Sequence, residues 1–174
     1  PLEFRSGGLR RQPTALSVPT LPPVLMFLER ITEMDTPLRK PSETPLRNVR
    51  PNIVQSIRAY RIPDLQAAAE ALGSHFLYAN LAHAQTKADV FELLSTQFYL
   101  PAHFGKNWDA LYDCMTDPIN KSGPQPGFVV VLDQIPTTPK FDKEVREQLL
   151  DVFRDTADFW AERKIPFRCF YSFL

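Results

Sequence analysis

Three segments in the second half of the chain carry the hydrophobic pattern of β-strands. Residues 128–132 are apolar at every position, which is typical of a strand buried on both faces of a parallel sheet. Residues 76–81 and 167–173 are short runs rich in aromatic and aliphatic side chains, as strands commonly are. We therefore predict a strand in each of these three segments.

Helices are predicted around these strands. Residues 87–98, 107–115 and 141–163 carry apolar side chains three and four positions apart, and Thr86 can cap the first of them. Residues 64–72 form an Ala-rich stretch followed by a glycine, as at the end of a helix. Strands separated by helices pair in parallel through right-handed connections. The pattern predicts an α/β fold, a small three-stranded parallel sheet packed by helices.

Proline dominates the first part of the chain. Ten of the 17 prolines lie in residues 1–63, where they interrupt every helical or strand pattern before it extends. We predict a Pro- and Arg-containing extension over residues 1–52, mostly disordered and irregular, with one short helix around residues 24–34. A short helical lead-in over residues 53–74 then precedes a domain over residues 75–174.

The two parts of the chain differ in charge, although the whole chain has a net charge of zero. Residues 75–174 hold 10 Lys and Arg against 13 Asp and Glu, a net charge of −3, while residues 1–74 hold 10 against 7, a net charge of +3. Nucleic-acid binding needs a basic surface, so the acidic part disfavours direct contact with nucleic acid. Its charge suits a cationic protein partner, although it is also ordinary for a globular domain.

Cysteine spacing disfavours a metal-binding protein, and hydropathy disfavours a membrane protein. Cys114 and Cys169 form no CxxC or other metal-binding spacing, so we predict no metal and no cofactor, and two unreactive thiols in a reducing compartment. No apolar run reaches the roughly 18 residues that cross a bilayer, so no membrane association is predicted.

Residues 100–117 are the most informative segment, because they predict a loop shaped by Pro101 and Gly105 that leads into a short helix with two different faces. The apolar face, at core spacing, consists of Trp108, Leu111 and Met115. The second face consists of Asp109, Tyr112, Asp113 and Thr116. Like charges at i and i+4 destabilise a helix, so Asp109 and Asp113 indicate a surface for a cationic group. A solvated helix face without a function is the simpler alternative.

The same segment resembles the signature of the barstar family, intracellular proteins that inhibit the secreted ribonuclease barnase. The similarity rests on Leu100-Pro101, on Phe104-Gly105, on Asn107 and on the run Asp109-Ala110-Leu111-Tyr112-Asp113-Cys114. Residues 150–155 are similar to a later helical segment of that family. The family's order of strands and helices also fits from about residue 75 onwards, and nothing before residue 75 shows the resemblance.

The resemblance also implies roles for individual residues. The residue that matches Asp113 takes the place of the substrate phosphate in the ribonuclease active site, and the one that matches Asp109 pairs with an arginine. Asn107 matches a residue that makes loop hydrogen bonds to the enzyme, although it can also cap the helix. Tyr112 stands where the family commonly has Trp. The rest of the implied contact surface is His103, Gly105, Thr116 and Asp155, the last at a position that is usually Glu.

Two departures from the family pattern bear on the identity of the partner. His103 stands where the family has a Tyr that packs on the enzyme's catalytic histidine, and an imidazole becomes cationic below about pH 6.5, which opposes binding to a cationic site. Pro118 or Ile119 replaces a later aromatic residue. These changes keep open a barstar-like immunity or scaffold protein for a different toxin or partner. A metal-dependent hydrolase that uses the Asp and His residues ranks lower, because the chain has no nucleophile motif or phosphate-binding glycine loop.

From the sequence we thus predict a stoichiometric inhibitor of a basic, microbial-type ribonuclease, with Asp113 mimicking a substrate phosphate. The predicted partner is a secreted or toxin ribonuclease with a basic active site, bound one to one by a monomer. The predicted protein is not an enzyme, uses no cofactor and acts in the cytoplasm, where it protects the cell that makes the ribonuclease.

Overall fold

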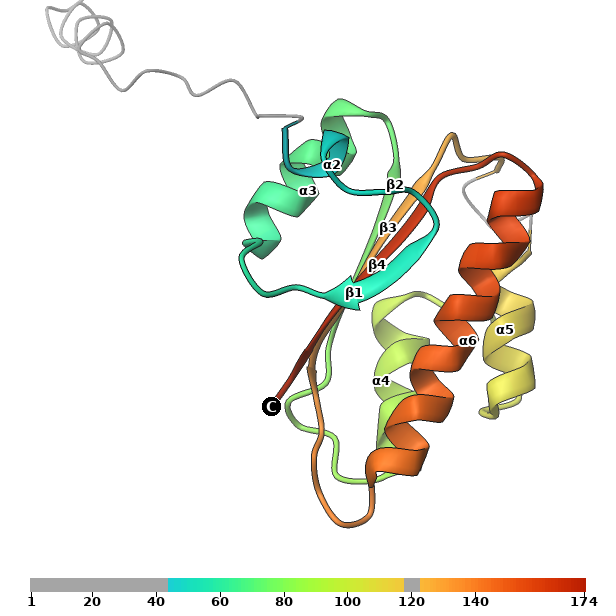
Figure 1. Ribbon diagram of the computed structural model, residues 1–174. Coiled ribbons are helices and arrows are strands. Elements are labelled where there is room, and N and C mark those ends of the chain that lie inside the picture. Colours follow the sequence, from blue (N-terminus) through green and yellow to red (C-terminus); the bar gives the residue numbers. More distant parts are fainter. Residues whose placement is uncertain (1–43, 118–122) are drawn as a thin grey trace, which may run out of the picture. The chain divides into compact units, whose positions relative to one another are not determined.

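The computed structural model describes residues 44–117 and 123–174 and shows a parallel sheet with helices on both faces (Figure 1). The sheet has the strand order β1-β4-β3-β2, and each neighbouring pair is parallel. The strands are β1 (Ile53–Ser56), β2 (His75–Asn80), β3 (Phe128–Ile135) and β4 (Phe167–Phe173). The predicted α/β class and the parallel pairing are confirmed. The predicted helix around residues 24–34 lies outside the described residues.

The prediction of three strands is wrong, because β1 adds a fourth at one edge of the sheet. β1 is only four residues long and all of its side chains are half-buried, so its sequence carries no alternating pattern. It pairs with residues 168–171 of β4. The side-chain amide of Asn52 holds the start of β1 in place by donating to the carbonyl oxygens of Ala157 at 2.9 Å and Ile165 at 3.0 Å.

Helices cover both faces of the sheet (Figure 1). One face is covered by α2 (Thr44–Arg47) and α3 (Ile62–Ala71), and the other by α4 (Lys87–Gln97), α5 (Trp108–Met115) and α6 (Lys143–Glu162). The sequence patterns assigned residues 44–52 to the extension and residues 53–74 to a helical lead-in. In the structure these residues form α2, β1 and α3, and Leu46 and Val49 are buried in the core on the α3 face.

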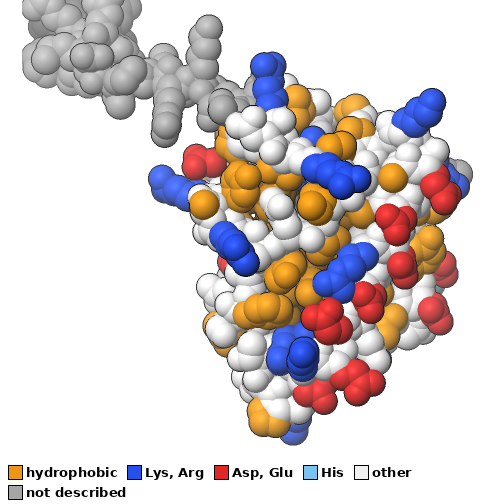
Figure 2. All heavy atoms as spheres, in the orientation of Figure 1, with side chains coloured by type: hydrophobic (Ala, Val, Ile, Leu, Met, Phe, Trp, Pro, Cys, Tyr) orange, Lys and Arg blue, Asp and Glu red, His pale blue; other side chains and the backbone are white. Residues whose placement is uncertain are grey.

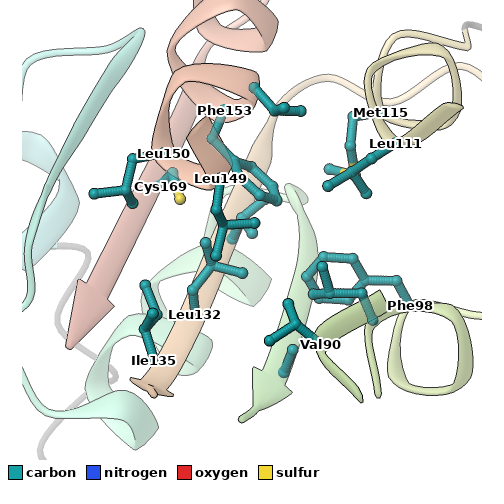
Figure 3. Close-up of a cluster of buried hydrophobic side chains, with 14 of the residues drawn as sticks. Val90, Phe98, Leu111, Met115, Leu132, Ile135, Leu149, Leu150, Phe153 and Cys169 are labelled. Carbon is teal, nitrogen blue, oxygen red and sulfur yellow. The ribbon is translucent and has the colours of Figure 1, made fainter. Parts of the chain in front are cut away.

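The position of β3 inside the sheet explains the continuous apolar run in its sequence. Val129 and Val131 are buried on the face that α3 covers, whereas Val130 and Leu132 face the larger core beneath α4, α5 and α6. Figure 3 shows this larger core, where Leu132 lies close to Leu149 of α6. The predicted strand buried on both faces is therefore confirmed.

Helix caps set the beginnings of α4 and α6. The Thr86 hydroxyl accepts from the backbone N–H of Asp89 at 3.2 Å, which confirms the predicted cap of α4. The Asp89 carboxylate in turn accepts from the backbone N–H groups of Gln85 and Thr86, and these bonds lower the pKa of Asp89. Asp142 caps α6 by accepting from the backbone N–H of Val145 at 3.0 Å.

Both cysteines are free thiols with little tendency to ionise. Burial raises the pKa of Cys169, and burial together with the carboxylates of Asp113 and Asp117 raises the pKa of Cys114. Both thiols therefore stay protonated near neutral pH. Within the described residues, no helix combines the length and the apolar character that crossing a bilayer requires.

Candidate functional site

The loop before α5 is held by a buried aromatic ring and a helix cap. Phe104 is buried, and its backbone N–H closes a turn within the loop. The side-chain oxygen of Asn107 accepts from the backbone N–H of Ala110 at 2.7 Å and caps α5. Gly105 lies exposed between these two anchors, and His103 lies exposed just before Phe104. Phe104 and Asn107 thus hold the loop in place while His103 and Gly105 stay exposed.

Gly105 is closely packed on one side although it is exposed. A Cβ atom at this position would meet the Asn107 side-chain nitrogen at 3.3 Å and the Ala110 Cβ at 3.4 Å. A larger residue would therefore press on the side chain that caps α5. This contact explains the glycine without any requirement for a left-handed backbone.

Trp108 fixes α5 against both neighbouring helices. Its ring packs on Phe91 of α4 with centroids 4.7 Å apart, and the Lys87 ammonium lies 4.7 Å from the ring centroid. Its indole N–H donates to the side-chain oxygen of Gln148 on α6 at 2.9 Å. With Leu111 buried beneath it, α5 is held in one orientation.

The outward face of α5 presents two carboxylates without internal partners. Asp109 and Asp113 are exposed, and neither side chain has a hydrogen bond or ion pair with the described part of the chain. Tyr112 between them is half-buried, with its ring edge-on to Phe159 at a centroid distance of 6.4 Å. Thr116 is buried instead, and its hydroxyl donates to the carbonyl oxygen of Tyr112 at 2.8 Å.

The carboxylates of Asp109 and Asp113 lie at positions where the electrostatic field of α5 differs. Asp109 lies in the first turn, where the positive end of the helix dipole favours a negative charge. Asp113 lies near the C-terminal end of the helix, which disfavours it, and one turn from Asp109, which repels it. Asp113 therefore lacks the favourable position in the helix that Asp109 has.

A groove of about 530 Å³ lies between α5 and α6. The α5 wall consists of Trp108, Asp109 and Tyr112. The α6 wall consists of Gln148, Asp151, Val152, Asp155, Asp158, Phe159 and Glu162. Five of these ten residues are acidic and none is Lys or Arg. Figure 2 shows acidic side chains gathered along this side of the molecule.

The structure brings three of the predicted site residues together in the groove, namely Asp109, Tyr112 and Asp155. Asp113 lies on the exposed surface of the same helix, outside the groove lining. The predicted loop residues His103, Gly105 and Asn107 lie at or before the start of α5, and Thr116 closes its C-terminal end. The α5 residues, the loop and one α6 residue therefore form the candidate site.

Apart from Asp155, the α6 wall of the groove was not assigned to the site from the sequence. Asp151, Asp158 and Glu162 recur with Asp155 at helical spacing in the sequence, but no sequence signal places these residues beside α5. Trp108 was assigned to the core, and it also lines the groove. Phe159 had no predicted role.

The described residues contain no group of three or more His, Cys, Asp or Glu side chains that is arranged to hold a metal ion. Two carboxylates near the groove are already paired with one arginine. Arg154 donates to Asp151 at 2.7 Å and to Glu147 at 3.1 Å, and these bonds raise the pKa of Arg154. The remaining groove carboxylates therefore offer acceptors for cationic groups.

A family model described as Barstar (barnase inhibitor) matches residues 74–172, which is more than half of the chain. The match spans β2 to β4 and includes α5, its preceding loop and the whole groove. A comparison with individual curated proteins gave no match. On the extent of the family match, this chain belongs to the barstar family.

Proposed function

We propose that this protein is a stoichiometric inhibitor of a basic, barnase-type ribonuclease, and that Asp113 takes the place of a substrate phosphate in the enzyme's active site. Membership of the barstar family supports the class of partner. The observation that carries the proposal is the exposed Asp113 carboxylate, which has no partner among the described residues. The C-terminal end of α5 and the neighbouring charge of Asp109 disfavour a negative charge at Asp113. A cationic group of a partner would therefore stabilise the Asp113 carboxylate.

A carboxylate suits this role because it presents two acceptor oxygens to guanidinium or ammonium donors in charge-assisted, often bidentate bonds. Asp113 has no internal ion pair that must break before binding. The Asn107 cap and the Trp108 contacts hold α5 in one orientation, which reduces the entropy lost on association. The acidic face is therefore organised before the partner arrives.

The other site residues support Asp113 in this proposal. Asp109 pairs with an arginine of the enzyme, and Tyr112 adds aromatic area with a polar tip. Asn107, Gly105 and His103 contact the enzyme from the loop. Thr116 acts indirectly, through its bond to the Tyr112 carbonyl, and Asp155 makes a peripheral contact from α6. The protein binds as a monomer in the cytoplasm, without cofactor, catalysis or direct contact with nucleic acid.

A titration of ribonuclease activity tests the proposal. The full-length protein is added in steps to a fixed amount of a purified barnase-type ribonuclease, and the cleavage of an RNA substrate is followed. Activity should fall in proportion to the added protein and vanish near one equivalent. Full activity at a large excess of the protein would refute inhibition of this enzyme class.

His103 favours one alternative, a barstar-like immunity or scaffold protein for a different toxin. It lies exposed in the loop at a position where the family pattern has Tyr. An imidazole offers less ring area than the Tyr side chain for packing on a partner. Failure to bind any barnase-type ribonuclease, with an intact fold, would move the assignment to this alternative.

A further inference from the structure

Tyr99 is the most exposed large apolar residue in the described part of the chain, with an exposed fraction of 80%. It lies two residues after the end of α4, at the start of the loop that carries His103 and Gly105. Its ring and hydroxyl make no hydrogen bond or ring contact with residues 44–117 and 123–174. The fold of these residues therefore does not account for an aromatic side chain at this position.

The backbone of Tyr99 adopts the left-handed conformation, with a φ of 53°. The backbone N–H of Leu100 donates to the carbonyl oxygen of Ser95 at 2.9 Å, and Leu100 packs against the larger core. A helix that ends with this bond needs a left-handed residue just before Leu100, and glycine is the usual choice. A residue with a Cβ atom, such as Tyr99, lowers the stability of the fold there.

Two other described helices end with the same bonds but with different residue types at the left-handed position. Gly73 lies two residues after α3 with a φ of 65°, and Lys164 lies two residues after α6 with a φ of 57°. Glycine avoids the steric cost, and lysine accepts it but keeps a charged group in water. Tyr99 combines the steric cost with the exposure of an aromatic ring. Strained residues cluster where a protein binds its ligands, so Tyr99 points to contact with a partner.

We infer that Tyr99 is a contact residue of the ribonuclease interface, and that its ring packs on an apolar patch of the enzyme beside the active site. This inference rests on the proposed function, because it extends the same interface along the loop before α5. Tyr99 lies four residues before His103, so their Cα atoms are at most about 14 Å apart. One side of a standard interface covers about 800 Å², the area of a disc about 16 Å in radius. An interface centred on His103 therefore reaches Tyr99.

Tyr99 supplies a kind of contact that the rest of this loop lacks. The other exposed residues of the loop are small or polar, namely Ala102, His103, Gly105, Lys106 and Asn107. A Tyr ring buries a large area at a small cost in conformational entropy, and Tyr is enriched at interface hot spots. The bond from Leu100 to Ser95 fixes the backbone at Tyr99, so the ring is held in place before the partner binds.

The test measures affinity and stability in the same variants. Tyr99→Gly removes both the ring and the steric cost, whereas Tyr99→Asn removes the ring but keeps a side chain that tolerates the left-handed backbone. Tyr99→Phe keeps the ring and loses the hydroxyl. The control is Leu72→Ala, which shortens an exposed apolar side chain at the end of α3, outside the family match. Each full-length variant is titrated calorimetrically against a barnase-type ribonuclease, and urea unfolding reports its stability.

We expect Tyr99→Gly and Tyr99→Asn to bind at least about tenfold more weakly than the parent protein, although both should unfold at a higher urea concentration. Tyr99→Phe and the control should stay within about twofold of the parent affinity. A gain in stability without a loss of affinity, beside strong binding by the parent protein, would overturn the role of Tyr99 and leave the proposed function intact. No binding by the parent protein would instead refute the proposed function, and the inference about Tyr99 with it.

Discussion

Asn107 joins the exposed loop to α5. Its side-chain oxygen accepts from the backbone N–H of Ala110, and its side-chain amide donates to the carbonyl oxygen of Gly105 at 3.3 Å. The first bond satisfies an N–H that the helix itself leaves free, and the second fixes the turn of the loop. One residue therefore couples the start of the helix to the geometry of the candidate contact surface.

We expect Asn107→Ala to lower the free energy of unfolding by about 1 kcal/mol, because the first turn of α5 loses its cap. Asn107→Ser should retain most of that stability, since a hydroxyl can accept the same bond. Urea unfolding of both variants measures the difference. Equal stability of the two variants would show that the cap contributes nothing to the fold.

His75 makes the stability of the fold depend on pH. It is half-buried at the start of β2, edge-on to Phe128, and burial lowers its pKa below 6.5. The unfolded chain then takes up a proton at a higher pH than the folded chain does. The contribution of His75 to stability is full above the unfolded pKa and decreases as the pH falls towards the lower, folded pKa.

We therefore expect His75→Gln to lose less stability than the parent protein when the pH falls from about 7.5 to about 5.5. The comparison needs urea unfolding of both proteins at each pH. Other groups that titrate in this range affect both proteins alike and cancel in the difference. A parallel decrease in the two proteins would contradict the role of His75.

At the scale of elements, helices and buried strands were predictable because each carries its own signal. The helix predicted over 87–98 is observed as α4, since Thr86 marks its start, and β4 has the predicted bounds. β3 continues three residues beyond the apolar run, because the hydroxyls of Tyr78 and Ser172 donate to Asp133 and satisfy its charge within the sheet. The sequence alone does not show which side chains will form hydrogen bonds with a polar residue in a strand.

β1 and the groove were not predictable, because both depend on contacts between distant segments. β1 has four half-buried residues and becomes a strand only beside β4. The groove needs α5 and α6 to lie together, and the Trp108–Gln148 bond that links them joins residues 40 positions apart. The α5 face was predictable from its spacing and its resemblance, whereas only Asp155 of the α6 wall was predicted, from the resemblance alone.

The contacts of α3 and β1 predict where the folding unit begins. Removal of residues 44–74 would expose Val129, Val131 and Phe170, which are buried on the α3 face. Exposing each such side chain costs roughly 1.5–3 kcal/mol, and small domains are stable by only about 5–15 kcal/mol. We expect a fragment over 44–174 to show cooperative thermal unfolding and a fragment over 75–174 to show none. Cooperative unfolding of the shorter fragment would place the start of the domain at residue 75.

At the scale of the whole molecule, charge is distributed unevenly. Residues 75–174 carry a net charge of −3, and five acidic residues line one groove beside the exposed Asp113. Such a surface attracts a basic protein over distances up to the Debye length, about 10 Å at 0.1 M salt. Electrostatic steering of this kind acts on the rate of association more than on the rate of dissociation (barnase and barstar are themselves a standard example).

We expect the association rate constant with a barnase-type ribonuclease to decrease steeply as salt rises from about 0.05 to 0.5 M, with a smaller change in the dissociation rate constant. Stopped-flow fluorescence follows both rates. As a control, the double variant Asp64→Asn with Glu144→Gln should reduce the salt dependence only slightly, because both residues are exposed and lie outside the groove. An association rate that does not change with salt would contradict electrostatic steering by this face.

The most direct test of the central claim is titration calorimetry of the full-length protein and its Asp113→Ala variant against a barnase-type ribonuclease. We predict one-to-one binding by the parent protein and a loss of at least about 2 kcal/mol in the variant, the general threshold for an interface hot spot, to which barnase and barstar themselves contributed. A loss smaller than tenfold in affinity, about 1.4 kcal/mol, would show that Asp113 does not act as the phosphate mimic.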